Sequence, residues 1–232
     1  MYGRGTAAQR PGNRCGRGDT PCGAPDRRLH AECLILSTRS NATSAMSQNS
    51  SLAITVFGSG RPPEGHAQYE EARALGRALA AAGFLVCSGG YGGVMEAVSR
   101  GAKEAGGGTL GVTASALRSR LNRWVDEEVR VATWEERLFE LVRRGDGYVA
   151  CKGGTGTLVE LAVVWEMLNK RVMSGKPFAV LGGFWQPVRD HVRNGEASLG
   201  PESNLLDGSL VRQCAAPADA AEYLSRALLG RR

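Results

Sequence analysis

From residue 52 onward, short apolar runs alternate with longer stretches in which apolar residues recur every three or four positions. Short apolar runs are typical of buried strands, and the longer spacing is typical of helices with one buried face. Residues 52–57 form the first run, and the helix that follows is expected to end at Gly83. The apolar face of that helix consists of Tyr69, Ala72, Leu75, Leu79 and Ala82.

The alternation continues along the rest of the chain. Further strands are predicted at residues 84–87, 109–112, 129–131, 148–151, 177–181 and 210–214, and further helices at 94–105, 134–142, 158–168 and 218–229. Strands that alternate with helices form parallel sheets, and the crossover helices cover both faces of the sheet. We therefore predict an α/β fold with an open, mostly parallel, doubly wound sheet of the Rossmann-like type.

Residues 1–50 differ in composition from the rest of the chain. They are rich in Arg, Gly, Pro, Ser and Asn and show no sustained apolar period, so they cannot bury enough apolar surface to offset the entropy of ordering. We expect this segment to be disordered or to precede a mis-assigned start near Met46, and an Arg-rich transit peptide is the alternative. Residues 51–232 are expected to form one domain.

Formal charge separates the same two segments. The whole chain carries +6, but residues 1–45 hold seven arginines against three acidic residues, so the remainder carries only +2. A near-neutral body argues against a dedicated nucleic-acid surface. No apolar run approaches the length of a membrane span. We expect a soluble cytoplasmic protein that binds neither nucleic acid nor membrane.

The six cysteines do not indicate a disulfide framework. Cys87 and Cys151 lie in apolar strand-like runs, which favours a reducing compartment. A second group lacks the close pairing of a zinc site, and it consists of Cys15, Cys22, His30 and Cys33. We expect no metal and no cofactor.

Glycine-rich turns follow three of the predicted strands. Ligands of an open parallel sheet bind beyond the carboxyl ends of its strands, so a site is expected at these turns. Glycines let backbone N–H groups approach an anion, and the helix that follows adds a favourable partial charge. Glycines also simply permit tight turns, but three such turns in one sheet favour a phosphate site. The turns are Gly58-Ser59-Gly60-Arg61, Ser88-Gly89-Gly90-Tyr91-Gly92-Gly93 and Lys152-Gly153-Gly154-Thr155-Gly156-Thr157.

Two standard nucleotide signatures are missing from these turns. A P-loop requires Lys-Ser or Lys-Thr after its glycines, and a dinucleotide site requires G-x-G-x-x-G. None of the three turns meets either pattern. ATPase chemistry and NAD binding therefore lose support, and another phosphate-bearing small molecule is indicated.

Glu160 follows the third turn and comes three residues after Thr157. Thr-x-x-Glu is the pattern of a capping box at the start of a helix, which is a purely structural role. A catalytic carboxylate is the other interpretation, because a merely structural glutamate beside a phosphate would be repelled by it. The sequence leaves both interpretations open.

Two of these motifs together resemble the "Lonely Guy" (LOG) family, whose members are cytokinin-activating or AMP-cleaving phosphoribohydrolases. The resemblance rests on residues 88–97, on residues 101–102 and on residues 152–160, and it extends over residues 54–229. The sequence departs from the family pattern at Lys152, where the family has proline, and at Leu138, where the family has a lysine after its arginine.

The resemblance implies that Glu160 and Arg137 act on the N-glycosidic bond of a nucleoside 5′-monophosphate, either AMP or an N6-substituted AMP. A carboxylate suits this bond, because its cleavage builds positive charge on the ribose and needs an activated water. The products would be the free base and ribose 5-phosphate, and the resemblance also implies a homodimer. The residues expected to bind phosphate and nucleoside are Gly153, Gly154, Thr155, Gly156, Thr157, Gly58, Ser59, Ser88, Gly89, Gly90, Met95 and Glu96.

Two other classes of protein have folds of this type. One is a non-catalytic carrier of a nucleotide or of molybdenum cofactor, and the departures at Lys152 and Leu138 would then mark a loss of catalysis. The other is a DNA-processing protein, which the near-neutral body disfavours.

Overall fold

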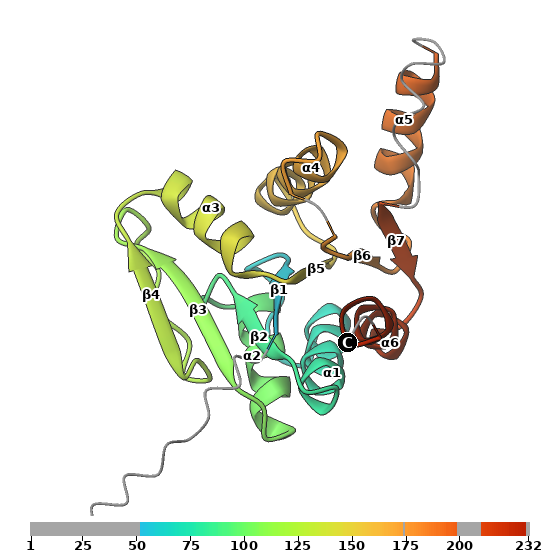
Figure 1. Cartoon of the computed structure of the whole chain (residues 1–232). Coiled ribbons are helices and arrows are strands. Elements are labelled where there is room, and N and C mark those ends of the chain that lie inside the picture. The colour runs from blue at the N-terminus through green and yellow to red at the C-terminus, as the bar shows by residue number, and fades with distance from the viewer. Residues whose placement is uncertain (1–51, 174, 199–209, 231–232) are drawn as a thin grey trace, which may run out of the picture. The chain divides into compact units, whose positions relative to one another are not determined.

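A computed structural model describes residues 52–173, 175–198 and 210–230 (Figure 1). The expectations for residues 1–50, including the cysteines among them, lie outside these ranges. The strands are β1 (Ala53–Phe57), β2 (Leu85–Ser88), β3 (Thr109–Ala114), β4 (Glu127–Val131), β5 (Gly147–Ala150), β6 (Phe178–Leu181) and β7 (Val211–Cys214). The helices are α1 (Ala67–Ala81), α2 (Val94–Glu104), α3 (Trp134–Arg144), α4 (Thr155–Asn169), α5 (Gln186–Ala197) and α6 (Pro217–Leu228). None of these helices combines the length and the apolar character that crossing a membrane requires.

All seven strands belong to one open sheet, with the order β4-β3-β2-β1-β5-β6-β7. Every neighbouring pair is parallel, so the predicted Rossmann-like sheet is confirmed, with no antiparallel strand in the described residues. The chain first winds outward from β1 to β4 and then crosses back to β5 and winds the other way. The crevice between β1 and β5 is therefore the switch point at which such sheets bind ligands.

Helices cover both faces of the sheet, as the alternation predicted. Successive strand residues point to opposite faces, and each face has its own apolar cluster. Val56 and Val149 pack with residues of α1, α2 and α6. Their neighbours Phe57 and Tyr148 pack on the other face with residues of α3 and α4. The inner strands β1, β3, β5 and β6 are therefore buried on both sides.

Two elements differ from the predictions. Helix α5 was not predicted, because its apolar positions are limited to Val188 and Val192 among charged and polar residues, too few to give a helical period. The proline at its start is the signal that was available. Strand β4 begins at Glu127, two residues before the predicted start. It is an edge strand with largely exposed residues, so its acidic first half leaves no apolar run.

Candidate functional site

A cavity of about 640 Å³ opens at the carboxyl ends of β1 and β5, where the switch point predicts a site. Four charged side chains line it: the cations Arg61, Arg137 and Lys152 and the carboxylate Glu160. The predicted site residues that line it are Gly58, Ser59, Met95, Arg137, Gly153, Gly154, Thr155, Gly156, Thr157 and Glu160. The lining residues that were not predicted are Gly60, Arg61, Gln68, Tyr91, Trp134 and Lys152.

Four predicted site residues do not line this cavity: Ser88, Gly89, Gly90 and Glu96. The first three support the cavity wall from behind. The fully buried Ser88 hydroxyl accepts a hydrogen bond from the Gly90 N–H at 3.2 Å, and the Gly89 carbonyl accepts one from Arg137. Their contacts are therefore with the protein rather than with the cavity.

The N-terminus of α4 opens onto the cavity. Gly154 is the N-cap, and no side chain caps the helix. The first N–H groups of any α-helix lack intrahelical acceptors and carry a positive partial charge. Gly154, Thr155 and Gly156 are exposed and line the cavity. This helix end therefore has the geometry of an anion-binding site.

The glycines of this turn serve two purposes. A Cβ at Gly153 would collide with the Thr157 side chain, so Gly153 is required by packing within the protein. A Cβ at Gly154 or Gly156 would meet nothing within 4 Å, and neither residue has a positive φ. Glycine in a helical turn is destabilising relative to alanine. The open space over Gly154 and Gly156 would accommodate a ligand. A ligand there would explain why glycine stands at two positions where packing within the protein does not require it.

Of the two interpretations of Glu160 that the sequence left open, the capping box with Thr157 is not formed. The helix begins at Thr155, because Gly154 already has the extended conformation of an N-cap, with φ −99° and ψ −155°. Thr157 is therefore buried within the first turn, and Glu160 lies in the second turn, too far along to reach the N-cap. The Glu160 carboxyl is free of that structural role and lines the cavity.

Arg137 is held rigidly beside Glu160. Charged residues such as Arg143 and Arg144 on the same helix are exposed, whereas Arg137 is only 6% exposed. Its Nε donates to the Val112 carbonyl at 2.8 Å, and its Nη2 donates to the Gly89 carbonyl at 3.1 Å. The guanidinium also lies 5.1 Å from the centre of the Tyr91 ring. Its Nη1 lies 4.0 Å from the Glu160 Oε1, so the two charges face each other inside the wall of the cavity.

Burial sets the ionisation of both groups. Removal from water raises the pKa of Glu160 to about 7, although the Arg137 charge acts in the opposite direction. Burial also lowers the pKa of Arg137, and the Glu160 charge offsets part of that effect. A carboxyl with a pKa near neutrality accepts and donates a proton readily at physiological pH, which suits general acid–base chemistry.

The turns after β1 and β5 are joined by hydrogen bonds. The Lys152 carbonyl accepts from the Ser59 N–H at 3.3 Å and from the Gln68 side chain. The Ser59 carbonyl in turn accepts from the Val94 N–H at 2.8 Å, at the start of α2. A Cβ at Gly58 would collide with the Val94 side chain, so the turn after β1 packs closely against this helix. The two turns therefore form one connected rim.

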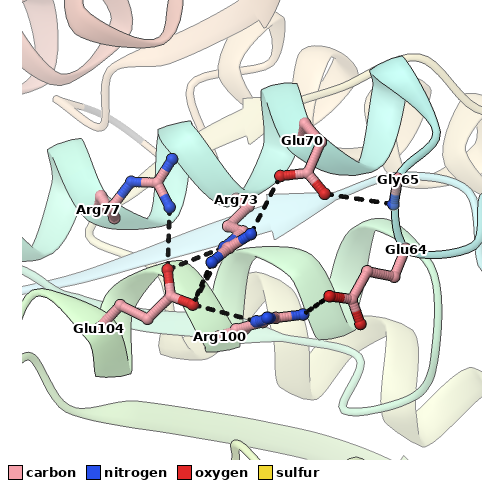
Figure 2. Close-up of polar contacts among 7 residues, drawn as sticks. All are labelled: Glu64, Gly65, Glu70, Arg73, Arg77, Arg100 and Glu104. Carbon is pink, nitrogen blue, oxygen red and sulfur yellow. Dashed lines mark hydrogen bonds and ion pairs between the residues drawn. The ribbon is translucent and has the colours of Figure 1, made fainter.

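An ion-pair network holds α1 against α2 (Figure 2). Glu104 on α2 pairs with Arg73 and Arg77 on α1 and with Arg100 on its own helix, at 2.6, 2.9 and 3.0 Å. Arg100 also pairs with Glu64 at 2.5 Å, which ties the segment between β1 and α1 to α2. These arginines hold the pKa of Glu104 down at about 2.

The unpredicted lining residues fall into two groups. Gly60, Arg61, Tyr91 and Lys152 lie within the glycine-rich turns, so the turns themselves were the available signal. Gln68 and Trp134 lie in the first turns of α1 and α3, and Trp134 was interpreted only as a helix marker. No local pattern distinguishes them.

Structural relatives include proteins that bind molybdenum cofactor. The molybdenum cofactor binding protein of Rippkaea orientalis is 27% identical, with a TM-score of 0.59 over 75% of this chain and 96% of that protein. The molybdenum cofactor carrier protein of Chlamydomonas reinhardtii is 26% identical, with a TM-score of 0.59 over 77% of this chain and 99% of that protein.

Sequence relatives support the expected likeness to phosphoribohydrolases at a distance. The cytokinin riboside 5′-monophosphate phosphoribohydrolase of Mycobacterium marinum is 40% identical over 99 residues, which are 41% of this chain and 53% of the enzyme, so the match spans about half of the enzyme. An uncharacterised protein of Archaeoglobus fulgidus is 32% identical over 132 residues, which are 57% of this chain and 85% of that protein. The family model described as the SLOG cluster4 family matches residues 51–188. Since this match covers more than half of the sequence, the chain belongs to the SLOG cluster4 family.

Proposed function

We propose that the protein hydrolyses the N-glycosidic bond of a nucleoside 5′-monophosphate, either AMP or an N6-substituted AMP. The observation that carries the proposal is the Glu160 carboxyl, which lines the cavity, has a pKa of about 7 and lies 4.0 Å from Arg137. It stands one helical turn beyond the uncapped N-terminus of α4, which offers an anion site. A phosphate there would place the ribose within reach of the carboxyl.

The phosphate end of the substrate is matched by positive charge. Lys152 and Arg61 line the cavity near the start of α4, together with the free N–H groups of the helix. The Lys152 Nζ lies 5.3 Å from the centre of the Phe184 ring. This cation–π contact favours one position of the flexible side chain. These groups would hold the 5′-phosphate and anchor the substrate.

Hydrolysis then follows from the chemistry of the carboxyl. As the bond between C1′ and the base breaks, positive charge develops on the ribose, and ionised Glu160 stabilises it. The carboxylate accepts a proton from the water that attacks C1′, and the departing base takes up one proton from solvent. Glu160 then returns its own proton to solvent, which regenerates the carboxylate. Arg137 acts as a positioning residue, because its other donors are fixed on backbone carbonyls and it keeps the carboxyl in place.

The test is to incubate the full chain with AMP and with N6-isopentenyl-AMP and to measure the released base and ribose 5-phosphate by chromatography. We expect release by the wild type and a loss of at least about a hundredfold in Glu160→Gln. Glu166→Gln is the matched control, since Glu166 is an exposed carboxylate of the same helix. No cleavage above the Glu160→Gln background with either substrate would refute the proposal.

A carrier of a phosphorylated cofactor is the second candidate function. The two molybdenum cofactor proteins share the fold over 96% and 99% of their length, at 27% and 26% identity. A carrier would bind such a ligand with an affinity that Glu160→Gln leaves unchanged, and it would release no base. Calorimetric titration of wild type and variant separates the two functions.

We also propose a homodimer. An apolar groove of about 230 Å³ lies between α4 and α5, and its residues include Leu158, Leu161, Ala162, Trp165, Val188 and Val192. Val159 and Val192 are each 37% exposed. Pairing of two chains would cover this surface, and light scattering on the purified chain tests it.

A further inference from the structure

An exposed tryptophan stands at the mouth of the cavity. Trp134 is the first residue of α3, lines the cavity and is 38% exposed. It lies three residues before Arg137, so both side chains project from the same face of the helix. A capping box fixes the backbone at this point, because Thr133 and Glu136 each accept a hydrogen bond from the other's N–H.

A second aromatic residue, Tyr91, also lines the cavity. The Tyr91 hydroxyl accepts from the Ala114 N–H at 2.9 Å, and the Arg137 guanidinium lies over the ring. Asn122 donates to the Gly90 and Tyr91 carbonyls at 3.0 Å, which fixes the turn that carries the ring. Tyr91 is only 8% exposed, so Trp134 is the aromatic side chain with a free surface.

The aromatic and cationic parts of the cavity come from different parts of the fold. Helix α3 packs against β1, β2, β3 and β4, whereas Lys152 and the start of α4 follow β5 (Figure 1). Glu160 and Arg137 meet between these two parts. A ligand with a phosphate at the start of α4 and its reacting bond at Glu160 would therefore extend toward Trp134.

We propose that Trp134 is the surface on which the base of the substrate stacks, and that the site prefers nucleotides with a large planar base. The inference rests on the proposed function for the position of the ribose. Stacking on an aromatic side chain strengthens with the overlapping ring area. A purine nucleotide is accordingly the preferred substrate class, and a pyrimidine nucleotide overlaps the indole less.

The test compares Trp134→Leu and Trp134→Phe with the wild type, using AMP and UMP as substrates and ribose 5-phosphate as an inhibitor. Loss of stacking in Trp134→Leu should raise the KM for AMP about tenfold, and Trp134→Phe should retain most of the affinity. The preference for AMP over UMP should fall in Trp134→Leu. Inhibition by ribose 5-phosphate should be unchanged, because that ligand has no base.

Binding is also measured without turnover, by the quenching of tryptophan fluorescence when AMP is added to Glu160→Gln. The quenching should disappear when Trp134→Phe is added and persist when Trp165→Phe is added, since Trp165 lines the separate groove between α4 and α5. Cleavage of AMP with an unchanged KM in Trp134→Leu would overturn this inference alone. Quenching that depends on Trp134 without cleavage would support it while refuting the hydrolase. Equal weakening of AMP and ribose 5-phosphate would also overturn it.

Discussion

Replacement of Glu160 by glutamine should stabilise the protein at alkaline pH and have little effect in acid. The carboxyl side chain is only 14% exposed, and burial raises its pKa from 4.5 to about 7. The folded state therefore binds this proton more tightly than the unfolded state does. Stability from this group is fully present below about pH 4.5, decreases as the pH rises toward 7 and is then constant.

The size of the effect follows from the displacement of the pKa. Each unit corresponds to about 1.4 kcal/mol, so the rise to about 7 makes the wild type about 3 kcal/mol less stable in its ionised form than in its protonated form. Glutamine has nearly the shape of the protonated carboxyl and cannot ionise. The free energy of unfolding of Glu160→Gln, relative to wild type, should therefore increase by about 3 kcal/mol between about pH 4 and about pH 8.

Urea unfolding monitored by circular dichroism at several pH values measures this difference. Glu166→Gln is the control, and its exposed position on the same helix predicts a change within about 0.5 kcal/mol at every pH. A Glu160→Gln difference that stays constant with pH would show that the carboxyl is not desolvated. The argument for acid–base chemistry at Glu160 would then lose its physical basis.

Four further substitutions test the site and its support. Gly156→Ala should stabilise the fold by up to about 1 kcal/mol yet weaken the binding of AMP, because its Cβ meets only open space, whereas Gly153→Ala should destabilise the fold. Thermal melts measure the stability and calorimetry measures the binding. Unchanged AMP binding in Gly156→Ala would contradict the phosphate site. The kcat/KM of the wild type should rise with pH around 7, as the Glu160 carboxyl ionises. Arg137→Met should move the midpoint of this rise to higher pH, because the arginine charge lowers the pKa of Glu160. An unmoved midpoint in the pH–rate profile would contradict the pairing of Arg137 with Glu160. Glu104→Gln should lower the free energy of unfolding by about 1 kcal/mol at neutral pH, after allowance for solvent screening. This loss should disappear as the pH falls from about 4.5 toward about 2, where the wild-type carboxyl protonates. Urea unfolding at low and neutral pH checks the trend, and a loss of stability that persists in acid would contradict it.

The sequence by itself determined the fold and the edge of the sheet that carries the site. Apolar runs alternating with helical spacing require parallel strands, and parallel strands bring their carboxyl ends to one edge. The turns after β1 and β5 therefore had to meet there, as the hydrogen bond from Ser59 to the Lys152 carbonyl records. Elements with too few apolar positions to show a period, such as α5, left only weak local signals, here the proline at its start.

Only the tertiary structure decided the surroundings of the individual residues of the candidate site. The start of α4 at Thr155 excludes the capping-box interpretation of Glu160, and burial in the assembled wall raises the pKa of its carboxyl. Arg137 is buried because its side chain donates hydrogen bonds to the carbonyls of Val112 and Gly89, which lie 25 and 48 residues away in the sequence. Burial and charge pairing depend on neighbours distant in the sequence, so no local pattern encodes them.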